Sequence, residues 1–205
     1  MMTKTLSLGA LTMSPFIQKS LACILLILCL SSTSRAIEEG ERLPQLKYRS
    51  IENTVVDLNT EIQNASAVII YYRGGWCPYC NRQLQALRKV EDEILKKGYQ
   101  IYAISPDTPD ELTKTLEQND LNYTLLSDSR MAGASALGIA YKVNNTVVKR
   151  YKNWGIDLEK SSGQTHHLLP HPAVIVVNTK GIVQYLYVNK DYKVRLSTED
   201  LLEAL

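Results

Sequence analysis

Apolar and polar residues follow one another in blocks that predict strands and helices in turn. Residues 67–73 form a continuous β-branched and aromatic run, the pattern of a strand buried on both faces. Pro78, a residue suited to the first turn of a helix, follows this run, and leucines and isoleucines then recur at helical spacing as far as Gly98. This stretch therefore predicts a buried strand that leads into an amphipathic helix.

The same order of strand and helix continues through the middle of the chain. A strand is predicted at residues 100–105, and Thr108 with Glu111 three positions later forms a capping box that begins a helix. Residues 123–126 predict another strand, and residues 131–137 predict a short helix. Such alternation favours a mainly parallel sheet with helices on both faces.

The C-terminal part of the chain has a different pattern. Residues 173–178 and 182–188 predict two strands joined by a tight turn, and Ser197 is placed to cap a final helix. Residues 151–163 are interpreted as a surface loop, with a strand considered at residues 147–151.

The N-terminal part of the chain has two sections of different composition. Residues 1–36 contain no Asp or Glu, and they place Lys4 and Lys19 before an unbroken apolar run at residues 21–30 that is followed by small residues. This order is typical of a secretory signal peptide, and the run is well short of the roughly 20 residues that a spanning helix needs. We expect cleavage after residue 36, which leaves residues 37–205 as an exported, periplasmic or secreted domain; a retained anchor is the alternative.

Within that domain, residues 37–50 are interpreted as a lead-in before a short strand at residues 54–58. Removal of the signal peptide also changes the charge. The whole chain has a net charge of +2, from 23 basic and 21 acidic residues, and three of the basic residues lie in the signal peptide. Residues 37–205 are thus close to neutral and have no basic cluster, which argues against nucleic-acid binding and against an electrostatic attachment to membranes.

Two of the four cysteines, Cys77 and Cys80, lie in the domain that remains, at the predicted helix start. A disulfide between residues so close together restricts the unfolded chain little, so a purely structural disulfide is disfavoured. The unpaired N–H groups and the dipole at a helix start favour a thiolate, the reactive form of cysteine. Lowering a thiol pKa from ~8.5 to ~6.5 raises the thiolate fraction at pH 7 about twentyfold. Arg73 either adds positive potential or is a solvated charge at the end of the strand.

Several stretches, in order along residues 37–205, resemble the peroxiredoxin-like branch of the AhpC/TSA family. The matching stretches are residues 72–81 (Tyr-Arg-Gly-Gly-Trp-Cys-Pro-Tyr-Cys-Asn), 104–108, 126–128, 169–173 and 191–196. The resemblance implies a thioredoxin-like three-layer α/β sandwich, with a mixed central sheet and helices on both faces. It also implies that a cis-proline loop at His171 and Pro172 faces the two thiols.

The same resemblance implies a substrate site around the two thiols, lined by Arg73, Trp76, Pro78, Tyr79, His171 and Pro172. Ordinary peroxiredoxins have Thr-x-x-Cys at this helix start and an arginine on the strand that faces it. In that alignment Cys80 takes the peroxidatic position, Cys77 replaces the threonine, and Pro172 falls on or next to the arginine. In the thioredoxin register the roles are reversed, and Cys77 is favoured as the thiol that attacks in disulfide exchange.

Both registers predict a thiol-dependent oxidoreductase that cycles Cys77 and Cys80 between dithiol and disulfide. We expect it to reduce peroxides or disulfides, to be reduced by a thioredoxin-like or other dithiol, and to need no cofactor. It is not expected to remain inserted in a membrane after cleavage.

A metal-binding module is the competing interpretation. The three histidines, His166, His167 and His171, lie in one stretch, and two thiolates with one or two imidazoles would form a soft copper or zinc site. Sco-type copper chaperones use a related fold with a cysteine pair and a histidine, although their cysteines are spaced by three residues. The spacing of two residues here favours redox chemistry, and no metal ligand is assigned.

Three residues near the C-terminus, Asp191, Tyr192 and Arg195, are functional candidates by the same resemblance. A structural ion pair that holds the last strand to the final helix is the preferred interpretation of them. Trp76 and Trp154 either line the site or serve packing alone.

Overall fold

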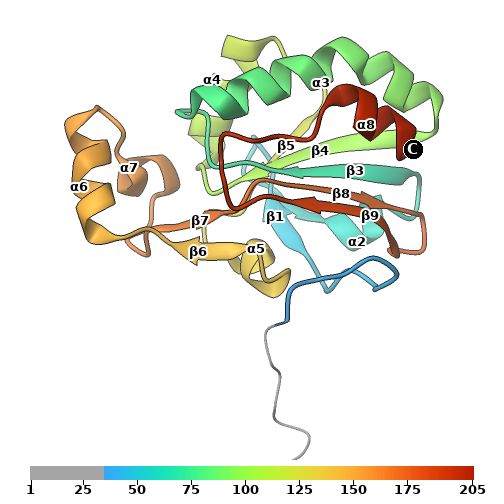
Figure 1. Cartoon of the computed structure of the whole chain (residues 1–205), viewed down its shortest axis with the longest axis horizontal. Coiled ribbons are helices and arrows are strands. Elements are labelled where there is room, and N and C mark those ends of the chain that lie inside the picture. The colour runs from blue at the N-terminus through green and yellow to red at the C-terminus, as the bar shows by residue number, and fades with distance from the viewer. Residues whose placement is uncertain (1–34) are drawn as a thin grey trace, which may run out of the picture. The chain divides into compact units, whose positions relative to one another are not determined.

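A seven-stranded mixed β-sheet forms the centre of residues 35–205, the part of the chain that the computed structural model describes (Figure 1). Its strand order is β2-β1-β5-β4-β3-β8-β9. The strands of this sheet are β1 (Lys47–Arg49), β2 (Val55–Asp57), β3 (Ser66–Tyr71), β4 (Tyr99–Ser105), β5 (Thr124–Ser127), β8 (Ala173–Val177) and β9 (Val183–Val188). A separate two-stranded sheet pairs β6 (Ala140–Lys142) with β7 (Leu168–Pro170).

The expected signal peptide lies almost wholly outside the described residues. The prediction covers residues 1–36, and only its last two residues belong to the described part. Ile37, which would be the first residue after cleavage, is buried and donates its N–H to the Leu137 carbonyl. Within residues 35–205, none of the helices combines the length and the apolar character that a membrane span requires.

The sheet is less parallel than the alternating pattern predicts. β3 runs parallel to β4, and β4 runs parallel to β5, but β1–β2, β1–β5, β3–β8 and β8–β9 are antiparallel pairs. The hairpin β8–β9 is antiparallel because a tight turn can join only antiparallel strands. The lead-in predicted for residues 37–50 is also wrong in part, because it contains β1, which pairs with β2 at one edge of the sheet. The mixed sheet implied by the family resemblance is confirmed.

Helices cover both faces of the sheet, which confirms the three-layer arrangement (Figure 1). Side chains of β3 alternate between two apolar cores, with Val68 and Ile70 in one and Ile69 and Tyr71 in the other. The first core is completed by α3, α4 and α8, and the second by α2, α5 and the segment before β1. The helices are α2 (Leu58–Glu61), α3 (Pro78–Lys96), α4 (Pro109–Asn119), α5 (Ala132–Ala136), α6 (Asn145–Asn153), α7 (Leu158–Ser162) and α8 (Thr198–Glu203).

Helix α3 begins and ends where the sequence predicts. Pro78 is its first residue, the buried face carries Leu84, Leu87 and Ile94, and Gly98 follows its end with a φ of +85°. The Thr108 cap of α4 is also confirmed, because its side chain accepts a hydrogen bond from the Glu111 N–H.

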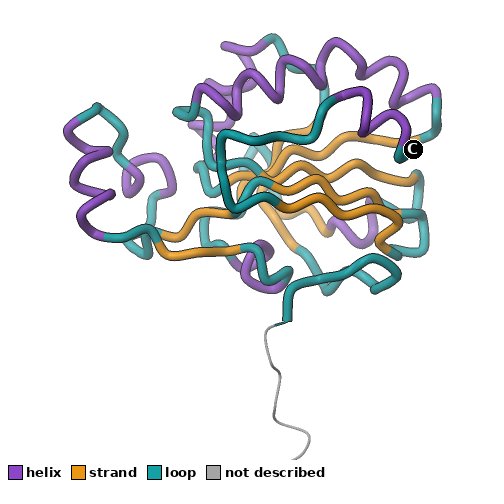
Figure 2. Tube along the Cα trace, in the orientation of Figure 1, coloured by secondary structure: helices purple, strands orange, loops and turns teal. Residues whose placement is uncertain are grey.

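The segment between β6 and β7 is helical, so the surface loop and the strand considered there are wrong. Figure 2 shows α6 and α7 beyond the β6–β7 ribbon, at one end of the sheet. The Asn144 side chain caps α6 by accepting a hydrogen bond from the Thr146 N–H. Val147, Val148 and Tyr151 recur at helical spacing and pack in a small cluster with other residues of this segment. The helical period therefore outweighs the strand preference of the two valines.

Candidate active site

The two cysteines lie where β3 passes into α3, at the carboxyl ends of the parallel strands. The Tyr72 N–H donates to the Ile104 carbonyl and extends the β3–β4 pairing by one residue. The chain then turns at Gly74, whose φ is +141°. A Cβ atom there would lie 2.4 Å from Trp76 Nε1 and 2.9 Å from Asp107 Oδ1, so this close approach requires glycine.

Cys77 is the N-cap residue of α3 and is a buried free thiol. The Cys80 thiol and the backbone N–H groups of Tyr79 and Cys80 lie near its sulfur and favour its charged form. Together with the nearby Arg73 guanidinium, these groups lower the pKa of Cys77 to about 6, although burial acts in the opposite direction. At pH 7 such a group is about nine-tenths thiolate.

Cys80 lies in the first turn of α3 and is also a buried free thiol. Burial, followed by the hydrogen bond and the negative charge of Cys77, raises the pKa of Cys80 well above its ordinary value. The neutral Cys80 thiol therefore donates to the Cys77 thiolate, and the pair shares a single negative charge at neutral pH.

Arg73 is buried beside Cys77 and is not a solvated charge at the strand end. Its Nη1 atom lies 3.8 Å from Cys77 Sγ, and its Nη2 atom donates to the Tyr151 hydroxyl at 2.6 Å. The guanidinium lies 4.0 Å from the centre of the Tyr192 ring and 4.9 Å from that of Trp76. Aromatic faces thus hold a desolvated cation against the sulfur that carries the negative charge.

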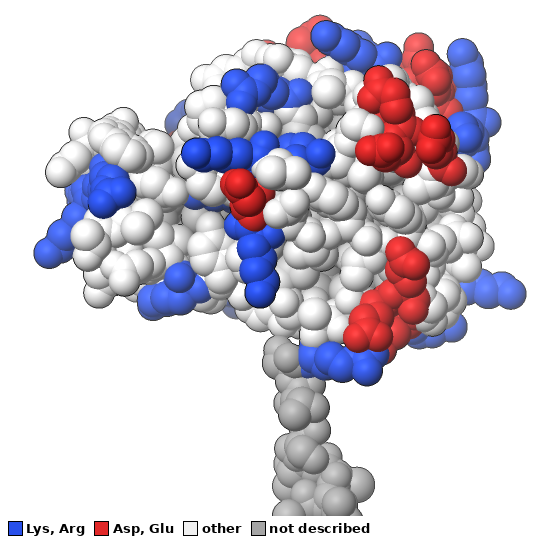
Figure 3. Space-filling view, in the orientation of Figure 1, with Lys and Arg blue, Asp and Glu red and all other residues white. Residues whose placement is uncertain are grey.

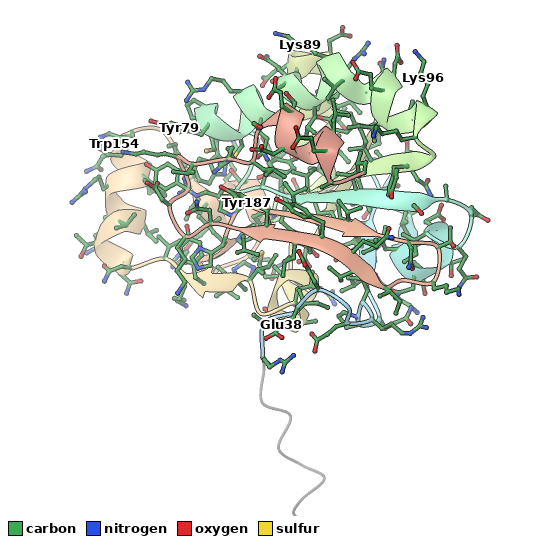
Figure 4. All side chains as sticks on the ribbon, turned by 45° about the vertical axis from the view of Figure 1, so that its right-hand side comes forward. Glu38, Tyr79, Lys89, Lys96, Trp154 and Tyr187 are labelled. Carbon is green, nitrogen blue, oxygen red and sulfur yellow. The ribbon has the colours of Figure 1, made fainter. Side chains whose placement is uncertain are left out.

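The residues between the thiols form the outer surface of the site. Pro78 is exposed, and Tyr79 is half-buried with its ring edge-on to Tyr192, at 5.7 Å between ring centres. Trp76 packs against Tyr151 at 5.7 Å. Figure 4 shows Tyr79 at the start of α3 and Trp154 on the helical segment at the same end of the molecule. Trp154 is 66% exposed, and its ring lies 6.2 Å from that of Tyr151.

The structure does not bring the histidines to the thiols as a ligand set. His171 stacks on Tyr141 at 4.4 Å between ring centres, His166 bonds to the Ser129 carbonyl, and His167 pairs with Glu159. In the part of the chain that is described, no group of three or more His, Cys, Asp or Glu side chains is arranged to hold a metal ion. The copper or zinc alternative therefore has no support.

The loop at Pro172 differs from the resemblance in its peptide geometry. Pro172 is buried, and its carbonyl accepts a hydrogen bond from the Asn189 N–H. No cis peptide bond occurs between residues 35 and 205, so the cis-proline implied for this position is wrong.

Asp107 is a site residue that sequence reasoning did not single out. It is buried, and its Oδ2 atom accepts hydrogen bonds from the Gly75 N–H at 2.7 Å and from the Ser105 hydroxyl at 3.1 Å. Its Oδ1 atom has no partner among the described residues. Burial raises the pKa of Asp107 to about 7, with a smaller contribution from the negative charge of Cys77. The sequence feature that could have identified Asp107 is its position, two residues after the end of a buried strand and within one of the matching stretches.

Arg195 lies at the site, as the family resemblance suggested, and the ion pair that was the preferred interpretation of it is wrong. Its Nη2 atom lies 3.5 Å from Cys80 Sγ, and its Nη1 atom donates to the carbonyl oxygens of Tyr192 and Val194. The Asp191 side chain instead accepts from the Lys193 N–H. No ion pair between Asp191 and Arg195 exists in the described structure.

A groove of about 380 Å³ lies beside Arg195 on the α3 side of the sheet. Leu87, Val174 and Leu196 contribute apolar surface to it, whereas Arg82 and Lys193 contribute positive charge. Figure 3 shows Lys and Arg side chains around the start of α3, and Asp and Glu side chains over α8. The groove therefore carries three basic side chains, of Arg82, Lys193 and Arg195, and one acidic side chain, of Glu199.

Comparison with known proteins identifies the family. A model of the AhpC/TSA family matches residues 40–186. The chain belongs to the AhpC/TSA family. It is 26% identical over 152 residues to peroxiredoxin Bcp of Escherichia coli, an alignment that covers 74% of this chain and 85% of that protein. It is 24% identical over 154 residues to the chloroplastic peroxiredoxin Q of Oryza sativa subsp. japonica, with 75% and 60% of the two chains covered.

Solved structures share the fold of this chain. Reduced Prx3 from Vibrio vulnificus in complex with hydrogen peroxide superposes with a TM-score of 0.68 and 17% identity, over 82% of this chain and 98% of that one. Peroxidoxin BcpB from Mycobacterium tuberculosis superposes with a TM-score of 0.65 and 16% identity, over 82% and 96% of the two chains. The AhpC/TSA protein described here is thus a thiol-dependent oxidoreductase of the peroxiredoxin type, with a thioredoxin-like fold.

Proposed function

We propose that this protein reduces peroxides, with Cys77 as the attacking thiolate and Cys80 as the resolving thiol. The observation that carries the proposal is the opposite direction of the two pKa shifts, since only the thiolate is a competent nucleophile. The relatives named as peroxiredoxins support a peroxide as the substrate. The alignment with ordinary peroxiredoxins assigns the attack to Cys80, but the helix cap and Arg73 favour Cys77.

The first step forms a sulfur–oxygen bond and breaks the peroxide bond. The Cys77 thiolate attacks one peroxide oxygen and becomes a sulfenic acid, while the other oxygen leaves and takes up a proton as water or an alcohol. Cys80 then attacks the Cys77 sulfur, forming the disulfide and releasing a hydroxide that is protonated to water. A dithiol reductant, a thioredoxin-like protein in our proposal, restores both thiols by disulfide exchange and is itself oxidised.

The test is oxidation of the reduced full-length protein by hydrogen peroxide and by an organic hydroperoxide. Mass spectrometry of the peptide that contains Cys77 and Cys80 should show one disulfide formed per peroxide consumed, and a dithiol should regenerate the thiols. A reduced protein that leaves both peroxides unconsumed yet reduces a disulfide substrate would replace this proposal with thiol–disulfide exchange.

We also infer that residues 1–36 direct export and are removed. Their lack of acidic residues and their short apolar run support this inference. N-terminal sequencing of the protein recovered from the exported fraction should begin at Ile37. Recovery of the uncleaved chain with the membrane would contradict cleavage.

A further inference from the structure

Arg195 contacts the sulfur that the first step of the reaction does not use. It reaches Cys80 Sγ at 3.5 Å from the segment between β9 and α8, 115 residues further along the chain. Arg73 instead places its guanidinium nearer Cys77, at 3.8 Å from that sulfur. Each of the two sulfurs therefore has a guanidinium of its own.

The segment that carries Arg195 is held to the site by several contacts. Arg195 Nη1 donates to the carbonyl oxygens of Tyr192 and Val194, which fixes the guanidinium relative to its own loop. The Tyr192 ring in turn packs on the Arg73 guanidinium at 4.0 Å and on Tyr79 at 5.7 Å. Arg195 Nε has no hydrogen-bond partner within residues 35–205, although it is buried. An arginine used only to tie the loop together does not need to place Nη2 on a sulfur.

Cys80 must become negatively charged at two points of the cycle. It attacks the oxidised Cys77 as a thiolate, and it leaves as a thiolate when the reductant breaks the disulfide at Cys77. Burial opposes this charge. The groups that face the Cys80 sulfur are Cys77, the backbone of Arg73, the Tyr72 hydroxyl and Arg195, and the Arg195 guanidinium is the cation within contact distance of it.

We propose that Arg195 is a catalytic residue for the second half of the cycle, in which its guanidinium stabilises the negative charge on Cys80 Sγ. This inference rests on the proposed assignment of Cys77 as the attacking thiol. During resolution the Cys80 thiol loses its proton to water, its thiolate forms the bond to the Cys77 sulfur, and the sulfur–oxygen bond breaks with release of hydroxide, which takes up a proton to become water. During reduction the reductant thiolate bonds to Cys77, and the electron pair of the broken disulfide goes to Cys80.

The first experiment separates the two halves of the cycle in Arg195→Met. A single addition of hydrogen peroxide should oxidise Cys77 at a rate within about twofold of the native protein, whereas disulfide formation should slow by about tenfold or more, the effect of one pKa unit. Dimedone should therefore trap the Cys77 sulfenic acid in the variant. Arg195→Lys, which keeps the charge, should recover part of the rate. Arg49→Met, exposed on β1 near the opposite edge of the sheet from β9, should leave both rates unchanged.

The second experiment needs no peroxide. In Cys77→Ser, the pH dependence of Cys80 alkylation by iodoacetamide should shift upward by about one unit when Arg195→Met is added. This result stands even if the protein proves not to be a peroxidase. If Arg195→Met does not fold, Arg195→Gln, which keeps donor groups without the charge, takes its place in both measurements.

Two outcomes would overturn the inference. An unchanged rate of disulfide formation together with an unchanged Cys80 alkylation profile would leave Arg195 with a structural role only. A slower oxidation by peroxide with normal resolution would assign Arg195 to the peroxide itself, and Cys80 to the attack.

Discussion

Cys77 and Cys80 lie three residues apart and are almost equally buried, at 1% and 0% exposure, yet their pKa values shift in opposite directions. Cys77 stands in front of the helix, at its N-terminal end and beside the Arg73 guanidinium, whereas Cys80 stands within the first turn. The difference shows that burial alone does not decide the state of a thiol. The donors that reach each sulfur decide it, and here they place the charge on Cys77.

The largest expected effect comes from replacing each cysteine in turn. Cys77→Ser should consume peroxide no faster than the double variant in which both cysteines are replaced by serine, because the remaining Cys80 thiol stays protonated at neutral pH. Cys80→Ser should still consume one peroxide per chain and stop at the Cys77 sulfenic acid, read out by dimedone labelling and mass spectrometry. If the first oxidation is instead lost in Cys80→Ser and kept in Cys77→Ser, then Cys80 is the attacking thiol and the assignment of the charge to Cys77 is wrong.

A smaller effect is expected from Asp107→Asn, which removes a buried acid near Cys77. Because burial raises the Asp107 pKa from 3.8 to about 7, the neutral form is favoured in the folded protein. The stability that the neutral Asp107 contributes is fully present below about pH 4 and is lost as the pH rises to 7. The free energy of unfolding falls over this range by at most about 4 kcal/mol. Asp107→Asn should therefore gain stability relative to the native protein over that range.

Chemical denaturation at pH 4 and pH 8 measures this change, with the exposed Asp92→Asn on α3 as the control. Because the negative charge of Asp107 also disfavours the Cys77 thiolate, the same substitution should extend alkylation of Cys77 to slightly lower pH. A stability difference between Asp107→Asn and the native protein that does not depend on pH would show that Asp107 is ionised throughout this range.

The smallest of these effects is expected from Arg73→Met, which removes one of several groups that favour the Cys77 thiolate. The native pKa of about 6 should rise by about one unit, which lowers the thiolate fraction about fivefold at pH 6 and by much less at pH 8. The pH dependence of Cys77 alkylation measures the shift, and Arg150→Met on the exposed side of α6 serves as the control. No shift would mean that the helix N-terminus and Cys80 alone set the charge on Cys77.

The local part of this site could be predicted from the sequence, because it depends on neighbours along the chain. A proline after Cys77 and a buried strand before it place the thiols at a helix start, and the structure has them there. The pattern also predicts most strands and helices, but it predicts a mainly parallel sheet, and only the family resemblance implied the mixed sheet that is found. It fails at α6, where the strand preference of Val147 and Val148 concealed a helical period.

The contacts between distant segments could not be predicted from the sequence. Arg195 meets Cys80 only because β9 returns along β8 and delivers the following loop to the start of α3. An arginine four residues after an aspartate near the end of the chain equally suits an ion pair, and no local pattern distinguishes the two. Likewise, the burial of Asp107 depends on the turn at Gly74, which packs over it.

The position of Trp76 gives the site an optical reporter of its own. The chain contains only two tryptophans, of which Trp76 lies beside Cys77 under the Arg73 guanidinium and Trp154 is 66% exposed to solvent. A change in the charge or bonding of the Cys77 sulfur therefore alters the surroundings of one indole and leaves the other as a steady background. Intrinsic fluorescence should follow each oxidation and reduction in real time without an added label.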